Sequence, residues 1–543
     1  MWSRFLCFFL FFVMTNVFGG MSSSLSAQMN MGMSSDELPQ SFQEPMKLFE
    51  KGLGPLTRTV TTDIVGAQAF FNQGLQLMYA FTPEDAARSF REAQKRDPSC
   101  AMCYFGEAWA WGHYLNGPMG PGDLPRAQEA INMASKLAEN ASGVEKALID
   151  AMEVRYVGRT DRSPQIAVDT LYSQAMADVY ADFPTDLDVG FLYAESLFLL
   201  EPRRGYRNID KPEVQVLHKV LEDVLDQDIR HPGNCHLYIH ATESTTQPHK
   251  AEACAEYLGN EIPGASHIQH MPSHTWNRVG RWAEGVRANT LAWHSDQKAA
   301  IGEGFAIYPS HNLHMLLFAA SNDGQGAVAM QAGKDYDELT GTSTYEILTK
   351  IRFGRFKEIL EMQGEPDPNP IFKGFWDFGH GYAHLKTGDM DEASQFLNAI
   401  ELGAEEASER AIFRQHSAKD MLAIVGGILK GEMLREEGRL SEAIEIFKQA
   451  VEIEDRLEYD EPEPLNFSVR DWLGSVLIEA ERFSEAEEVY RLALEDHPHN
   501  GWSLFGLEQA LRHQGKRGPA DEVLKAFEEA WQRSDVWLAT SHF

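Results

Sequence analysis

Histidines with helical spacing gather in the middle of the chain. Ten of the 19 histidines lie between His231 and His314, in a chain of 543 residues. Residues three or four apart lie on one face of a helix, so each short group is expected to project from one helix face. The three groups contain His236, His240 and Glu243, then His267, His270 and His274, and then His311 and His314.

These side chains are typical metal ligands. Imidazole with a carboxylate suits Zn, Cu, Fe or Ni, and metal binding needs neutral imidazole. Seven histidines and one glutamate exceed the four ligands of a closed zinc site, so two ions or a second layer of groups is implied. Copper or zinc is favoured and iron is retained, with Glu243 as a ligand or a general base. The alternatives are a metal-free groove for a peptide or an anion, and chance placement.

Methionines give copper some additional support. Met29, Met31 and Met33 alternate along the chain, and thioethers suit Cu(I). Met271 and Met315 stand beside the histidines, although packing between helices explains them equally well. A linker that happens to contain methionine is the alternative for the first three.

The four cysteines beyond residue 27 can form two pairs. Cys100 and Cys103 are a Cys-x-x-Cys without a following histidine, which excludes c-type haem attachment. A redox-active disulfide is one reading of this pair. Cys235 and Cys254 are expected on the two helices of one hairpin, where a disulfide would stiffen the unit that carries His236. A purely structural role for all four is the alternative.

Aromatic residues are expected near the histidine groups. One unit carries Phe105 and Trp109, followed by His113, and another carries Phe375, Phe378 and Tyr382. Such residues either fill the inside of a helical array or shape a pocket for an organic ligand. No Gly-x-Ser-x-Gly, His-Glu-x-x-His, phosphate-binding glycine loop or dinucleotide fingerprint occurs, so the sequence leaves open whether the chain is an enzyme.

Composition excludes several classes of protein. The formal net charge is −33 at pH 7, which argues against binding nucleic acid, whose partners present clustered cations. Five cysteines are too few for a disulfide-rich scaffold. The hydrophobic share of 43% is ordinary for a soluble protein, and the length predicts several domains or one long repeat array.

The first residues are typical of a secretory signal peptide. Arg4 precedes an apolar run from Phe5 to Phe18, which is shorter than the about 20 residues that a membrane span needs. Cleavage is expected after residue 19, 20 or 27, and an uncleaved anchor is the alternative. The sequence therefore predicts an exported protein, periplasmic or extracellular, with no membrane insertion after the signal is removed.

In the rest of the chain, apolar residues recur at intervals of three and four, and this spacing predicts an all-α protein. Small and aromatic residues also recur with a period near 34. Each unit places a glycine first, an alanine 12 residues on, an aromatic residue 16 on and a second alanine 19 on. The units are Gly74, Ala86, Phe90 and Ala93; Gly431, Ala443, Phe447 and Ala450; and Gly474, Ala486, Tyr490 and Ala493.

This pattern of small and aromatic residues resembles the tetratricopeptide repeat, a 34-residue helix–turn–helix unit. The resemblance implies helical hairpins stacked into a right-handed superhelix with a concave groove lined by the first helices. The runs around Phe71 and Cys100, with the histidine-rich middle, further resemble a group of exported bacterial tetratricopeptide proteins without an established activity. The expected organisation is a signal peptide at 1–27, a flexible lead-in at 28–60, and repeats or repeat-like units at 61–230, 231–334, 335–415 and 416–543.

The repeat register brings the histidine groups together. His236 and His270 are 34 residues apart, as are His240 and His274. With the units anchored on their turn and packing residues, the histidines fall at the second, fifth and ninth positions and Glu243 at the twelfth. In the family that the sequence resembles, these positions line the concave groove. The sequence therefore predicts a metal site there, in a binding protein or an enzyme; the alternative is a metal-free scaffold that holds a protein, a peptide or a small molecule.

Overall fold

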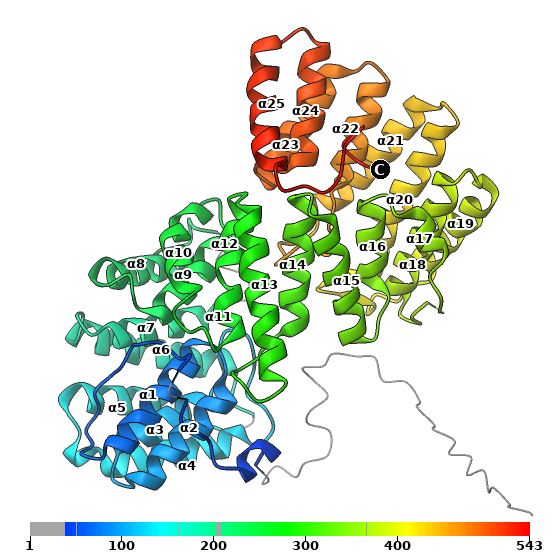
Figure 1. Cartoon of the computed structure of the whole chain (residues 1–543). Coiled ribbons are helices and arrows are strands. Elements are labelled where there is room, and N and C mark those ends of the chain that lie inside the picture. The colour runs from blue at the N-terminus through cyan, green and yellow to red at the C-terminus, as the bar shows by residue number, and fades with distance from the viewer. Residues whose placement is uncertain (1–37, 50, 161, 202–207, 365) are drawn as a thin grey trace, which may run out of the picture.

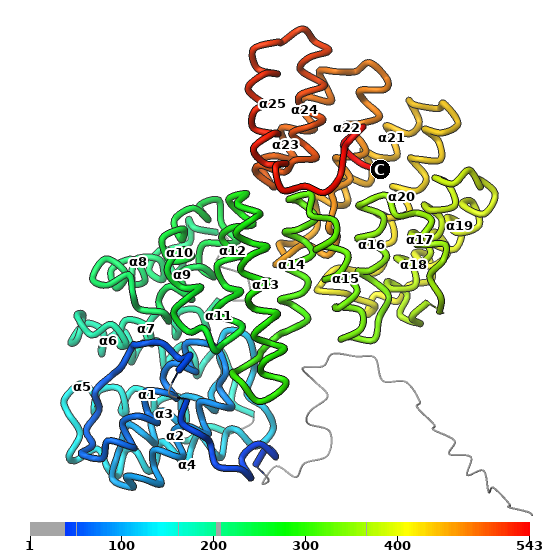
Figure 2. Tube along the Cα trace, in the orientation of Figure 1, coloured from blue at the N-terminus to red at the C-terminus, as the bar shows by residue number. Residues whose placement is uncertain are grey.

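The computed structural model describes residues 38–543 except 50, 161, 202–207 and 365. The predicted signal peptide and Met29, Met31 and Met33 lie outside the described residues. Helical hairpins follow one another from the N-terminal end to the C-terminal end (Figures 1 and 2), and a two-residue antiparallel hairpin of β1 (Ile412–Phe413) and β2 (His416–Ser417) interrupts them. The predicted all-α solenoid is confirmed.

The helices of the first half begin with a short 3-10 helix. Its bounds and those of the following helices are η2 Gln40–Gln43, α1 Val65–Tyr79, α2 Pro83–Arg96, α3 Ala101–Ala110, α4 Asp123–Leu137, η3 Ala138–Asn140, α5 Gly143–Tyr156, α6 Gln165–Asp182, α7 Leu187–Phe198, α8 Pro212–Gln227, α9 Pro232–Glu243, η5 Pro248–Ala251, α10 Glu252–Leu258, α11 Ser266–His270, α12 Pro272–Arg278 and α13 Trp282–Ala299.

The second half continues with longer and more regular pairs. Their bounds are α14 Pro309–Asn322, α15 Gly326–Thr340, α16 Thr344–Arg352, α17 Phe356–Leu360, α18 Pro370–Lys386, α19 Met390–Glu406, α20 Ala418–Glu436, α21 Leu440–Glu454, α22 Val469–Glu479, α23 Phe483–Asp496, α24 Gly501–His513 and α25 Arg517–Trp531. No helix in the described part of the chain combines the length and the apolar character that crossing a bilayer requires.

Close contact between a glycine and an aromatic ring joins the two helices of a hairpin. A Cβ atom added to Gly74 would lie 2.6 Å from the Phe90 ring. The same construction gives 2.5 Å from Gly431 to the Phe447 ring and 2.3 Å from Gly474 to the Tyr490 ring. Any side chain there would displace the ring. The small residue that begins each unit is therefore required by packing.

Two apolar cores divide the molecule. One includes buried residues from Met46 to Phe305, and the other includes buried residues from Trp282 to Ala520. The boundary between them falls at α12, α13 and α14. His274 on α12 and His311 on α14 therefore lie where the two cores meet.

Pro272 divides the helix that was expected to carry His267, His270 and His274. The first two histidines lie on α11 and the third lies on α12, which begins at Pro272. Proline has no N–H for a helical hydrogen bond, so the helix cannot run through it unbroken. Met271 between them keeps helical backbone angles, so the two short helices still present their histidines in succession.

The C-terminal segment returns along the last repeats. Tyr490 Oη and Ser541 Oγ lie 2.7 Å apart, and the Tyr382 hydroxyl donates to the carbonyl oxygen of Phe543 at 2.7 Å. Figure 1 shows this segment in red, crossing from α25 towards α22. Tyr382 therefore contacts the chain's own last residues rather than an open pocket.

Candidate metal centre

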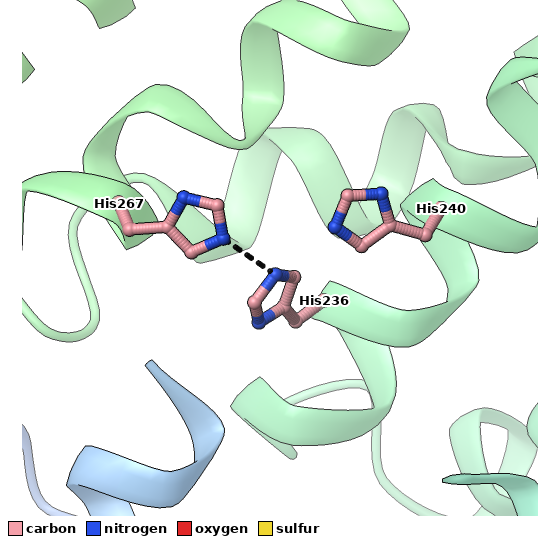
Figure 3. A group of neighbouring side chains, drawn as sticks. All are labelled: His236, His240 and His267. Carbon is pink, nitrogen blue, oxygen red and sulfur yellow. Dashed lines mark hydrogen bonds between the residues drawn. The ribbon is translucent and has the colours of Figure 1, made fainter. Parts of the chain in front are cut away.

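The first histidine triad joins α9 to α11. His236 and His240 come from α9 and His267 from α11, all three are buried, and their ligand nitrogens lie within 4.8 Å of one another (Figure 3). His236 Nδ1 donates to the Tyr79 carbonyl oxygen at 2.7 Å, because that oxygen can only accept. This bond fixes the tautomer and leaves His236 Nε2 with a lone pair, 3.2 Å from His267 Nε2.

The second triad joins α11 and α12 to α14. His270, His274 and His311 bring their ligand nitrogens within 4.8 Å of one another. His270 Nδ1 lies 2.8 Å from Asn289 Oδ1, while Asn289 Nδ2 donates to the Gly285 carbonyl oxygen at 2.9 Å. The orientation of the amide is thereby set, so His270 Nδ1 carries the hydrogen and His270 Nε2 carries the lone pair.

Glu243 lies between the two triads. Its Oε1 accepts from His240 Nδ1 at 2.8 Å and its Oε2 accepts from His274 Nδ1 at 2.5 Å. The Tyr459 hydroxyl also donates to Oε2, at 3.1 Å. One carboxylate therefore fixes the tautomer of one histidine in each triad and turns both Nε2 lone pairs away from itself.

Two imidazole nitrogens in the second triad face each other. His270 Nε2 and His274 Nε2 are 2.7 Å apart, although both rings carry their hydrogen on Nδ1. In the first triad, His240 Nε2 and His267 Nδ1 are buried and have no hydrogen-bond partner among the residues that the structure describes. A buried polar nitrogen without a partner is costly, and a cation at the centre of the first triad would satisfy His240 Nε2.

Burial keeps four of these six imidazoles neutral. It lowers the pKa of His236, His267, His270 and His311 well below the usual value, and the neighbouring histidines lower it further. Burial alone would raise the pKa of Glu243, but the charges of His274 and His240 outweigh it and hold that pKa well below its usual range. His236, His267, His270 and His311 are therefore held in the neutral form, which binds metal, beside one carboxylate anion.

Phe81 covers the first triad from the N-terminal half. Its ring centroid lies 4.0 Å from that of His236 and 5.7 Å from that of His267. Its φ is 57°, a left-handed conformation that is rare for a bulky residue and costs on the order of 1–3 kcal/mol. The packing of the triad against the turn after α1 maintains this conformation.

A cavity of about 290 Å³ borders both triads. His240, His267, His274 and His311 form one wall of it. The other walls come from distant parts of the chain, namely Asn116, Tyr308, Arg414, Gln415, Asp460 and Glu461. Gln415 is exposed and His311 is partly exposed, so the cavity adjoins solvent on that side.

Sequence periodicity did not indicate the residues that close this cavity. Arg414, at the turn between β1 and β2, donates to both oxygens of Asp460, at 2.7 and 2.8 Å. Glu461 Oε2 lies 3.5 Å from His274 Nδ1, and burial followed by the charge of Glu243 raises the pKa of Glu461. These residues lie in loops between repeats, where no repeat position marks them.

A short part of the chain matches a known protein family. Residues 428–456, which span the end of α20 and most of the hairpin formed with α21, match the family model of the tetratricopeptide repeat. The contact of Gly431 with Phe447 belongs to this segment. This segment is a tetratricopeptide repeat. The predicted family is confirmed there, and no curated protein sequence matches the chain.

Solved structures with a similar arrangement include other helical repeat proteins. The human IFIT1 dimer with m7Gppp-AAAA has a TM-score of 0.32 at 12% identity, over 87% of this chain and 91% of that chain. The APC/C hetero-tetramer Cut9-Hcn1 has 0.28 at 11% identity, over 87% and 89%. The tetratricopeptide domain of P58(IPK) has 0.21 at 12% identity, over 83% and 99%. Scores of this size carry no inference about ligands or partners.

The remaining predicted site residues lie outside the two triads. The His314 ring packs against Tyr345, with ring centroids 4.3 Å apart. The five predicted groove aromatics are buried and none borders the cavity of the histidines: Phe105, Trp109, Phe375, Phe378 and Tyr382. The structure pairs Cys100 with Cys103 and Cys235 with Cys254. The second pair joins α9, which carries His236 and His240, to α10.

Proposed function

We propose that this tetratricopeptide-repeat protein is a metal-dependent enzyme whose six clustered histidines hold a transition-metal centre. The approach of His270 Nε2 to His274 Nε2 at 2.7 Å carries the proposal. Because both rings can donate through Nδ1, to Asn289 and to Glu243, a metal ion between the two Nε2 atoms would bind both rings. A proton shared by the two nitrogens, with its charge paired by Glu243, is the metal-free alternative, whereas a metal ion is held by the neutral imidazoles.

The cavity favours catalysis over a structural role for the metal. A structural zinc site is closed by four protein ligands, whereas a catalytic site has three protein ligands and an open position. Each triad supplies three imidazoles, and both triads border the cavity of about 290 Å³. A small organic molecule or a water molecule in that cavity would reach the open position.

Copper or zinc fits this donor set best, and iron is the third candidate. Each triad offers imidazole nitrogen and no thiolate, and imidazole suits these three metals. The Irving–Williams order places Cu²⁺ above the others at such a site. When bound, the ion would polarise a substrate oxygen or activate a bound water, while Glu243, Asn289 and the Tyr79 carbonyl hold the ligand rings.

Metal analysis of the chain made without a histidine tag tests this proposal. The metal-free chain is reconstituted separately with Cu(II), Zn(II) and Fe(II), passed through a desalting column and analysed for metal. Less than about 0.2 ion per chain with every metal would refute it, since triads of this kind bind tightly enough to survive desalting. Azide added to the copper form should shift its absorption and EPR spectra by filling the open position; unchanged spectra would favour a closed site.

A metal-free scaffold is the second candidate. Proteins with tetratricopeptide folds generally bind protein partners, and the match at 428–456 favours this reading. A partner whose binding is unaffected by substitution of His270, in a chain that binds no metal, would support it over the enzyme.

We also propose that the chain is exported. The apolar run from Phe5 to Phe18 after Arg4 supports this, as do the two cysteine pairs, because disulfides persist in oxidising compartments. N-terminal sequencing of the protein recovered from the producing cells tests it. A mature chain that begins after residue 19, 20 or 27 is the expected result, and an intact Met1 in the cytosolic fraction would contradict it.

A further inference from the structure

We infer that the histidine cluster holds two metal ions, in two sites related by the repeat, and that Glu243 is a positioning residue shared by both. This inference rests on the proposed metal function and goes further, because a single ion would also satisfy that proposal. The number of ions bound per chain separates failure of the two-site inference from failure of the metal proposal.

The two triads take their histidines from the same repeat positions. His236 and His240 occupy the fifth and ninth positions of one unit, and His267 occupies the second position of the next. The second triad repeats this choice one unit later, with His270 and His274 at the fifth and ninth positions and His311 at the second position of the following unit. Stacked repeats place equivalent residues in equivalent surroundings, so the two triads are two copies of one site.

The repeat positions also explain where the array of sites ends. His314 occupies the fifth position of the third unit and could begin a third triad. Its ninth position is Phe318, which is buried in the second core and offers no ligand atom. The His314 ring packs against Tyr345 instead. The chain thus carries two complete copies of the pattern and one incomplete copy.

Ligand number supports two ions rather than one. A tetrahedral ion takes four ligands at about 2.0–2.1 Å from nitrogen, so six imidazoles exceed what one such ion accommodates. The two triads nevertheless adjoin each other, since the ring centroids of His240 and His274 are 5.4 Å apart and those of His267 and His270 are 5.6 Å apart. Two ions would share the one cavity that both triads border.

Glu243 connects the two sites without belonging to either triad. Its two oxygens accept from His240 Nδ1 and His274 Nδ1, which are the ninth-position histidines of the two copies. Each bond keeps the hydrogen on Nδ1 and the lone pair on Nε2. The fully buried carboxylate also supplies negative charge beside both ions. Its place at the twelfth position of the first unit puts it one turn beyond His240, between the two copies.

Counting ions in matched variants tests the number of sites. The full-length metal-free chain without a tag is loaded with Cu(II) or Zn(II), desalted and analysed. We expect two ions per chain in the wild type and in His314→Ala, and one ion in His267→Ala and in His270→Ala. One ion in the wild type, lost in both single variants, would overturn the two-site inference and leave the metal proposal standing. No ion in the wild type would overturn both, and two ions in all four proteins would place the metal elsewhere.

A spectroscopic measurement on the wild type avoids the risk that a variant misfolds. In the chain loaded with two Cu(II), adjacent ions should give a half-field EPR transition or an integrated intensity below the copper content. A full-intensity spectrum of isolated ions would contradict adjacent sites.

The role of Glu243 is tested by chelator competition. Glu243→Ala is expected to lower the affinity for both ions by about 10- to 100-fold, because the substitution removes the hydrogen-bond partner of a ligand histidine in each site. A substitution that only disturbs packing would lower thermal stability without changing the two affinities together. A loss of affinity for only one of the two ions would refute the role of Glu243 as a positioning residue shared by both sites.

Discussion

Replacing Asn289 by leucine should weaken metal binding at the second triad alone. Asn289 is fully buried, and its Oδ1 accepts the hydrogen of His270 Nδ1 at 2.8 Å. Leucine has a similar volume and no acceptor. The variant therefore removes one hydrogen bond while the side chain still fills its place between α13 and α11.

Loss of this hydrogen bond destabilises the metal-bound state more than the metal-free state. Without metal, the His270 ring of the variant can move its hydrogen to Nε2 and donate it to His274 Nε2, only 2.7 Å away. With metal on Nε2, the hydrogen must stay on Nδ1, where it would be buried without an acceptor. An unsatisfied buried donor costs about 1–3 kcal/mol, which corresponds to a loss of about 5- to 150-fold in affinity.

Competition with a chelator of known affinity measures this loss for each ion. The matched control is Asn289→Asp, whose carboxylate can still accept from Nδ1 and should retain most of the affinity. Thermal melting of the metal-free forms reports whether the leucine variant folds. Asn289 does not hold His270 for metal binding if the leucine variant binds metal as tightly as the wild type, or if the aspartate variant loses as much affinity as the leucine variant.

Three further predictions concern stability. The metal-free chain should lose stability as pH falls below about 6.5, because five buried histidines have lowered pKa values and the unfolded chain therefore takes up protons first. Each of these histidines lowers the free energy of unfolding by up to about 1.4 kcal/mol per pH unit. Urea unfolding at pH 7.5 and 5.5 measures the sum. A difference no larger than that of an ordinary acidic protein would count against neutral imidazoles. Gly474→Ala should cost about 1–3 kcal/mol because its Cβ would lie 2.3 Å from the Tyr490 ring, whereas Gly518→Ala meets nothing within 4 Å and should be tolerated; equal melting temperatures would contradict the packing argument. Each bound ion at 100 times its dissociation constant should add about 2.7 kcal/mol, so a melting temperature that a chelator does not lower would indicate no metal in the folded chain.

Helical periodicity explains why part of the centre was predictable. Spacings of three and four set His236 with His240, and His267 with His270, on common helix faces, and the 34-residue period set the two groups in register. The period did not show that the second position of one unit completes the triad of the preceding unit. That pairing depends on how adjacent hairpins stack in space, which spacing along one helix does not contain.

Residues outside the repeats could not be predicted in this way. Arg414 and Asp460 close the cavity from loops of the second half, and their approach to His274 depends on the path of the whole solenoid. The break at Pro272 was visible in principle, since proline interrupts a helical hydrogen-bond ladder. The sequence placed Tyr382 in an open groove and did not show that the last residues of the chain contact this side chain, because those residues carry no repeat signature.

Because the ligands come from successive repeats, bound metal would also affect how the repeats hold together. The first triad joins α9 to α11, and the second joins α11 and α12 to α14, so each ion would connect one unit to the next. In a solenoid each unit contacts only its neighbours, and stability is roughly the sum of unit and interface contributions. The ion of the second triad, which reaches α14, would therefore stiffen the boundary between the two apolar cores, beside the cavity. Because loops of both halves line that cavity, its shape depends on the angle between the halves, and metal binding and substrate access become two properties of the same interface.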